Sequence, residues 1–166
     1  MADTYYLGAD AVIYYLPPSD ETADDAAARV IEILAGEIMA NVGNVNVTLD
    51  KEEQDVTTHG GGGYKGTWGA IKKCSVEFTL ICTDPPSADD AYIALRDAFF
   101  NTGVLGYQNG FISMAVLSGP TADPLSRGPV GDFYISGLSR PEPSEGVIEI
   151  GVTAKLNKFY GYEPSA

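Results

Sequence analysis

The sequence predicts one mainly β domain over residues 1–166 with one or two helices, and three observations support this. The 166 residues are enough for a single ordinary core. Apolar residues make up 45 % and charged residues 20 % of the chain, which is typical of a folded protein rather than a disordered one. Apolar and polar residues alternate with a period of two over several segments. That period predicts strands with one buried and one solvated face.

The strands are predicted in two ways. Alternation predicts four of them, at 44–50, 73–83, 132–136 and 148–156, with Ile81 as the one departure within its segment. Segments 10–16 and 111–117 alternate less clearly, but they are rich in β-branched and aromatic residues, which favour strands. The sequence therefore predicts at least six strands.

One helix is predicted between two of these strands. It follows Pro85-Pro86, with Ser87 as N-cap and Asp90 three residues later. Apolar residues then recur at helical spacing, and Gly103 is expected to end the helix. The helix is amphipathic, so we expect it to lie against a sheet.

A second helix is predicted over about 22–35. Thr22 and Asp25 form a capping pair, and apolar residues follow on one side. The β-branched run at 30–33 equally allows part of this segment to be a strand. The acidic residues that precede it lack the ligand spacing of a calcium loop. They are interpreted as a solvated helix start, and they are Asp20, Glu21, Asp24 and Asp25.

Charge and cysteine content exclude several function classes. The net charge of −13 disfavours a conventional nucleic-acid binder, because phosphates would be repelled. Cys74 and Cys82 lie in one predicted strand, about 26 Å apart, so they cannot form a disulfide with each other and are expected to be small buried groups. One histidine and two separated cysteines do not make a zinc site. We expect no cofactor, no membrane anchor and no secretory signal.

The glycine-rich stretch after residue 58 suggests two enzyme motifs. His59-Gly60-Gly61-Gly62 has the letters of an esterase oxyanion loop, but the chain lacks a Gly-x-Ser-x-Gly nucleophile motif. Gly61-x-Gly63-x-x-Gly66 matches a dinucleotide fingerprint, yet no helical pattern follows. A small esterase built around His59 is therefore the weaker alternative, and we expect no enzymatic activity. Four consecutive glycines are costly to order, which favours a loop that contacts a partner.

Several segments, in order, resemble phage tail tube proteins, and together they cover about Asn44 to Asn157. The matching segments are Asp55-Val56-Thr57-Thr58 with the glycine loop and Trp68, Ser75-Val76-Glu77-Phe78, Ala94 to Asn101, Val130-Gly131-Asp132-Phe133, Ser139-Arg140-Pro141-Glu142-Pro143, and Val152-Thr153-Ala154-Lys155. The chain departs from the pattern at about 17–40, where it carries an acidic insertion. His59 also stands where the family commonly has a basic residue.

The resemblance implies a β-sandwich or barrel flanked by an α-helix, whose subunits join into a hexameric ring. Four strands from each subunit would form one continuous inner β-barrel, and stacked rings would form a conduit for DNA ejection. It also implies a virion location, synthesis in the host bacterial cytoplasm, and contacts with tape measure, tail terminator and baseplate or tail-tip proteins, and with a sheath where one is present. An alternative is the inner tube of a contractile injection or secretion system, which carries protein cargo.

Two sets of residues are candidates for roles in such a tube. Glu77, Asp132 and Glu149 lie on the polar side of predicted strands and are candidates for an acidic wall that repels DNA; an ordinary outer face is the alternative. The polar loop from Asp50 to Gly66 is too long for a tight hairpin and is the candidate contact between rings. Its candidate residues are Asp50, Lys51, Glu52, Glu53, His59, Gly60, Gly61, Gly62, Gly63 and Tyr64.

Overall fold

The computed structural model of the protein describes residues 11–16, 25–56, 66–82, 90–100, 111–122, 126–141 and 146–161. They form one seven-stranded antiparallel sheet in the order β2-β1-β5-β6-β7-β4-β3, with two helices. This confirms the predicted mainly β class. The elements are β1 (Val12–Leu16), α1 (Ala26–Leu34), β2 (Glu37–Ile38), β3 (Val42–Val56), β4 (Gly66–Cys82), α2 (Asp90–Phe100), β5 (Phe111–Leu117), β6 (Val130–Ser139) and β7 (Ile148–Gly161).

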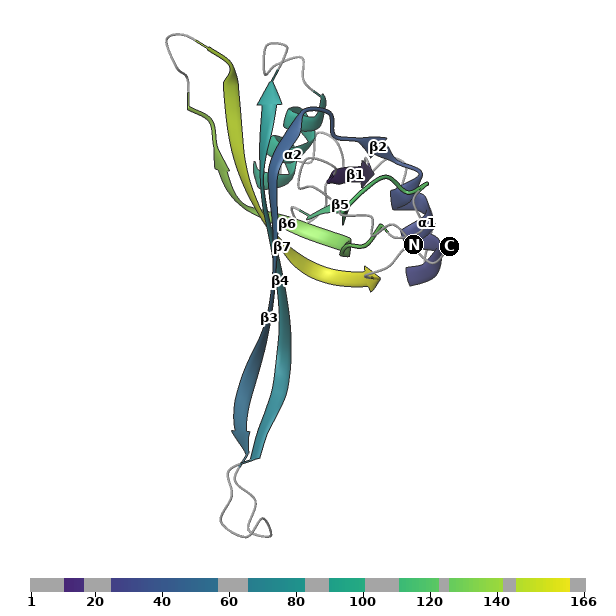
Figure 1. The fold of residues 1–166 in the computed structure, drawn as a ribbon, viewed down its shortest axis with the longest axis vertical. Helices are drawn as coiled ribbons and strands as arrows, with labels where there is room; N and C mark the ends of the chain where they lie inside the picture. Colours follow the sequence, from purple (N-terminus) through teal and green to yellow (C-terminus); the bar gives the residue numbers. More distant parts are fainter. Residues whose placement is uncertain are drawn as a thin grey trace, which may run out of the picture.

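The sheet curls so that its two ends face each other across the main core (Figure 1). Phe78 on β4 and Ile13 on β1 belong to one buried cluster, although three strands, β5, β6 and β7, lie between β1 and β4 in the sheet. Leu95 of α2 is fully buried in the same cluster, so this helix covers part of the core. The predicted amphipathic helix against a sheet is thus confirmed.

Strand β6 takes part in both layers of the curled sheet. Its first half, Val130 to Tyr134, pairs with β5, whereas β7 follows β6 along its whole length to Ser139. The β6–β7 register shifts between Ile135 and Gly137. Such an irregularity bends a strand and increases its twist. The second half of β6 therefore leaves β5 and joins a layer made of β6, β7, β4 and β3.

Helix α1 covers the opposite layer. Val30 and Ile33 of α1 are buried in a second cluster, against Leu16 of β1 and Leu117 of β5. Figure 1 shows α1 on the side of the molecule away from β3 and β4. Burial of this apolar stripe explains why the segment is a helix and not the alternative strand, because a helix presents residues i and i+3 on one face.

The start of α1 differs from the prediction. Asp25, not Thr22, is the N-cap, and its Oδ1 accepts a hydrogen bond of 2.8 Å from the Ala28 backbone N–H. Thr22 and the acidic residues at 20, 21 and 24 lie outside the described residues, as does Ser87 before α2. Both residues of the predicted pair are good caps, so the sequence alone did not decide between them.

Strands β3 and β4 form a hairpin that is longer than predicted. Residues 50–56 belong to β3 and residues 66–72 to β4, so the first part of the predicted inter-ring loop is a strand. Asp50, Lys51, Glu52 and Glu53 are thus strand residues and not loop residues, whereas their contact between rings stays a prediction. His59, Gly60, Gly61, Gly62, Gly63 and Tyr64 lie outside the described residues. Residues 50–55 are all polar, so this part of β3 has no alternation of apolar and polar residues that could predict a strand.

Candidate functional site

One face of the layer β6-β7-β4-β3 is polar and uncovered by either helix, and we call it the open face. Its members alternate with core residues such as Val76, Phe78 and Val152 along the same strands. A shallow hollow on it is lined by Glu77, Thr79, Thr153 and Ser139, among others. The open face comprises Asn46, Thr48 and Asp50 of β3, Lys73, Ser75, Glu77, Thr79 and Ile81 of β4, Glu149, Gly151, Thr153 and Lys155 of β7, and Gly137 and Ser139 of β6.

The register places open-face residues in rows across four strands. In one row Asn46 pairs with Glu77, Glu77 with Thr153, and Thr153 with Gly137. A Cβ built on Gly137 would lie 3.5 Å from Thr153 Cβ, which is ordinary contact, so glycine is not required there for space. The layer is therefore a continuous, regular surface that displays small polar side chains and a few charges.

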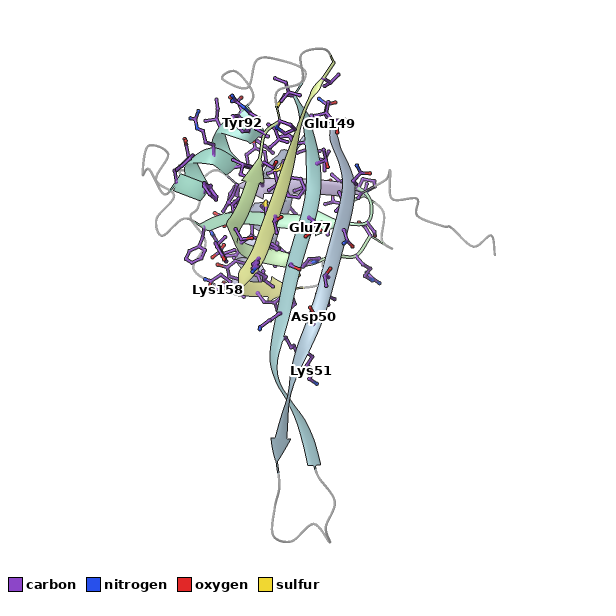
Figure 2. The ribbon with its side chains drawn as sticks, turned by 90° about the vertical axis from the view of Figure 1, so that its left-hand side faces the viewer. Asp50, Lys51, Glu77, Tyr92, Glu149 and Lys158 are labelled. Carbon is purple, nitrogen blue, oxygen red and sulfur yellow. The ribbon has the colours of Figure 1, made fainter. Side chains whose placement is uncertain are left out.

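Glu77 and Glu149 are both exposed on this face, as the polar parity predicted. Figure 2 looks onto the face, with Glu149 near one end, Glu77 in the middle and Asp50 toward the β3–β4 hairpin. The face also carries two cations. Lys73 lies beside its register partner Asp50, and Lys155 lies beside its register partner Ser75. Its charge is therefore mixed rather than uniformly acidic.

Asp132 lies elsewhere, in a polar cluster beneath α1. Its Oδ1 accepts a 2.7 Å hydrogen bond from the Ser113 hydroxyl, and its Oδ2 accepts one of 2.7 Å from the Tyr160 hydroxyl. The guanidinium of Arg29, a residue only 7 % exposed, donates to Ser113 Oγ at 2.9 Å and lies 3.8 Å from Asp132 Oδ1. The three candidates for an acidic wall are thus not brought together.

Arg29 is the residue of this cluster that sequence reasoning missed. It lies between apolar neighbours on the buried side of α1, beside Val30 and Ile33. Its guanidinium carbon stands 5.8 Å from the centroid of the Tyr160 ring, and its Nη1 donates to Glu32 at 3.3 Å. An arginine on the apolar stripe of a helix was the available signal, since buried arginine is almost always paired. The cluster fixes α1 to β5, β6 and β7.

The cluster shifts the titration of Tyr160. Burial, followed by the hydrogen bond to Asp132 and its negative charge, raises the pKa of Tyr160 above its ordinary 10.0, although Arg29 acts in the opposite direction. The folded state therefore keeps this proton to higher pH than the unfolded state does. Stability from this group is complete below about pH 10 and falls as the pH rises through the folded pKa.

We expect Tyr160→Phe to flatten the alkaline stability profile. Between about pH 9 and pH 11 the unfolding free energy of the wild type should fall more steeply than that of the variant, because the variant has no phenol to ionise. Urea denaturation at both pH values measures the two slopes. Equal slopes would contradict the raised pKa of Tyr160.

The far end of the β3–β4 hairpin is a two-stranded arm. Strand β7 pairs with β4 from Ser75 to Cys82, whereas β4 from Gly66 to Lys73 pairs, among described residues, with β3 alone. We call residues 50–56 of β3 and 66–73 of β4 the arm, and Figure 1 shows it projecting well beyond the rest of the sheet. A lone two-stranded ribbon is at best marginally stable in water, so the arm is a candidate for contact with another molecule.

The layer has two edges without a described partner. Strand β3 is the last strand of the sheet, and the second half of β6 has β7 on one side only. Unpaired edges present rows of backbone N–H and C=O groups that can pair with another chain. Exposed edges of this length favour an assembly rather than a lone subunit.

The described residues hold little that suggests chemistry. Cys74 and Cys82 are buried and form no disulfide, as predicted, and burial raises the pKa of the Cys74 thiol. Among described residues, no group of three or more His, Cys, Asp or Glu side chains could hold a metal ion. In the same part of the chain, neither helix has the length and apolar character needed to cross a membrane.

Comparison with known proteins identifies the fold. No family model matches the sequence, and no curated protein does. Among solved structures, the tail of a gene transfer agent particle with C6 symmetry is similar over 96 % of this chain and 98 % of that chain, with 16 % identity and a TM-score of 0.60.

Two further structures agree. The SPP1 tail tube is similar over 96 % of this chain and 78 % of that chain, with 12 % identity and a TM-score of 0.61. A chain of the anti-feeding prophage baseplate is similar over 96 % and 95 %, with 6 % identity and a TM-score of 0.57. These neighbours are components of virions or related particles. With its curled sheet, long hairpin and flanking helices, the chain has the tail tube fold.

Proposed function

We propose that this protein is the repeating subunit of a phage tail tube, a structural virion protein that forms stacked rings around a DNA conduit. The observation that supports this most is the layer β6-β7-β4-β3, which has an uncovered polar face and two edges free for pairing. The tail tube fold and the assembled state of its structural neighbours add to it. We assign no catalytic role.

Ring closure follows from the strand order. In each subunit the β3 edge would pair with the second half of β6 in the next subunit. All neighbouring strands of the layer are antiparallel, and the layer holds an even number of them, so β3 and the incoming β6 also run antiparallel. Six subunits, by analogy with the C6 gene transfer agent tail, would close a barrel of about 24 strands. Barrels of 16 to 18 strands already leave an aqueous channel.

The open face would line the lumen of this barrel. Its polar surface and mixed charge suit passage of DNA without specific binding, because each added cation would release counterions and strengthen phosphate binding. The opposite side of the subunit, with α1, would then face outward. Tape measure, tail terminator and baseplate or tail-tip proteins, and a sheath where one is present, are the partners this placement implies.

We expect the double variant Glu77→Lys with Glu149→Lys to slow DNA release from assembled particles. It replaces two exposed carboxylates of the open face with cations in every subunit, so the wall would attract phosphate, and release should recover as salt is raised. Release rates measured at several salt concentrations test this. If the double variant released DNA at the wild-type rate at low salt, Glu77 and Glu149 would not line the lumen.

The inner tube of a contractile injection or secretion system is the second candidate. Similarity to a chain of the anti-feeding prophage baseplate favours it. Both candidates predict the same ring and differ in cargo, which is DNA in one and protein in the other. The nucleic acid and protein content of particles purified from the source decides between them.

Negative-stain electron microscopy of the purified protein, with its mass measured by light scattering, tests the proposed function. We expect rings or hollow tubes at high protein concentration, with a bore wide enough for duplex DNA. A monomer that stays compact at every concentration and salt condition would contradict the proposal.

A further inference from the structure

Lysines gather at one end of an otherwise acidic molecule. The chain has 23 acidic and 10 basic residues. The lysines in the part of the chain that the structure describes are Lys51, Lys72, Lys73, Lys155 and Lys158, all on β3, β4 or β7. Lys72, Lys73 and Lys155 line one hollow at the root of the arm. Figure 2 shows Lys51 and Lys158 toward the arm and Glu149 toward the opposite end. The described lysines therefore lie nearer the arm than Glu149 does, with Asp50, the exposed register partner of Lys73, among them.

Two of these lysines face each other directly. Lys51 of β3 and Lys72 of β4 are register partners, and both side chains are exposed. Like charges directly opposite each other destabilise an antiparallel pair. The isolated subunit thus holds an unfavourable pair at the place where its arm leaves the sheet, and an anion bound there would relieve it.

A large apolar side chain adjoins this pair. Leu49 lies two residues before Lys51, on the same side of β3, and its side chain is 56 % exposed although its register partner Cys74 is buried. We call Leu49, Lys51 and Lys72 the arm-root patch. An apolar centre with a charged rim is the usual anatomy of a protein interface, and the two-stranded arm beyond it needs further packing for stability.

We infer that the arm-root patch binds carboxylates of the next copy of this chain along the tube axis. The inference rests on the proposed function, and it names the charges that set the polarity of stacking. Glu149 on β7 is exposed toward the opposite end of the subunit (Figure 2), and α2, whose first residue Asp90 is exposed, also lies toward that end (Figure 1). Head-to-tail stacking brings this end against the lysines, whereas head-to-head stacking would bring lysines against lysines.

Lys51→Glu separates a role in the interface from a role in the fold. The new carboxylate lies opposite Lys72, so the like-charge pair becomes an opposite-charge pair. We expect the melting temperature of the unassembled subunit to equal or exceed that of the wild type. Stacking should weaken instead, with the protein concentration needed for tubes rising about tenfold. If Lys51 acted only in the fold, weaker stacking of the variant would come with a lower melting temperature.

Light scattering and electron microscopy over a range of NaCl concentrations measure the stacking. Lys51→Arg keeps the charge and should assemble like the wild type. Arg127→Glu makes the same charge change at an exposed site in the β5–β6 connection and should also leave stacking unchanged. Wild-type tubes should shorten as salt is raised, since screening weakens exposed charge pairs.

The outcomes separate this inference from the proposed function. Lys51→Glu tubes that form at the wild-type concentration, or wild-type tubes insensitive to salt, would overturn the role of the arm-root patch and leave the tail tube proposal intact. Failure of the wild type to form rings or tubes would overturn both.

Discussion

Subunits in which residues 52–71 are replaced by Asn-Gly should fold normally but fail to form tubes. The replacement joins Lys51 to Lys72, which are register partners, through a two-residue turn that suits an antiparallel hairpin. Within the described chain, β4 pairs with β7 only from Ser75 onward, so the sheet that contacts the core keeps all its strands. The removed segment is the part of the arm that would reach the next ring.

Thermal unfolding and electron microscopy measure the two halves of this prediction. We expect a melting temperature within a few degrees of the wild type, single rings or free subunits, and no long tubes. Lys51→Arg is a suitable control, because it leaves the arm intact. Long tubes from the shortened protein would show that the arm is not the contact between rings.

Asp132→Lys should destabilise the fold strongly, whereas Glu77→Lys should not. A lysine at position 132 would place a second cation beside buried Arg29 and would leave the hydroxyls of Ser113 and Tyr160 without their acceptor. Breaking a buried ion pair in this way costs about 3–5 kcal/mol. For a chain of this size that corresponds to a fall in melting temperature of roughly 6–20 °C.

Glu77→Lys makes the same chemical change on the exposed open face. Surface substitutions usually change stability by less than about 0.5 kcal/mol, so its melting temperature should stay close to that of the wild type. Equal melting temperatures for the two variants would contradict the cluster around Asp132. The contrast also decides how lumen charge is tested, because a variant that includes Asp132 would report on folding as well as on DNA release.

The fold class and the main elements could be predicted from the sequence alone. Period-two alternation predicted the cores of β3, β4, β6 and β7, because a strand with one buried face must alternate. It also predicted that Glu77 and Glu149 are exposed and that both cysteines are buried. Capping residues and apolar spacing predicted α2 and α1, since these signals are local to each helix. Strand β2 was not predicted, because two residues are too few to carry a period.

What covers each polar face could not be predicted from the sequence, because it depends on how the elements pack. Asp132 and Glu77 both lie on the polar side of a predicted strand. Nevertheless, α1 covers Asp132, whereas neither helix covers Glu77. Alternation distinguishes the two sides of a strand but not the element packed on each side, which depends on how β6 passes between the two layers. Likewise, residues 50–55 of the arm are all polar, so alternation could not predict that this part of β3 is a strand. Pairing between distant segments, which local patterns do not encode, placed Lys51 opposite Lys72 and Arg29 beside Asp132.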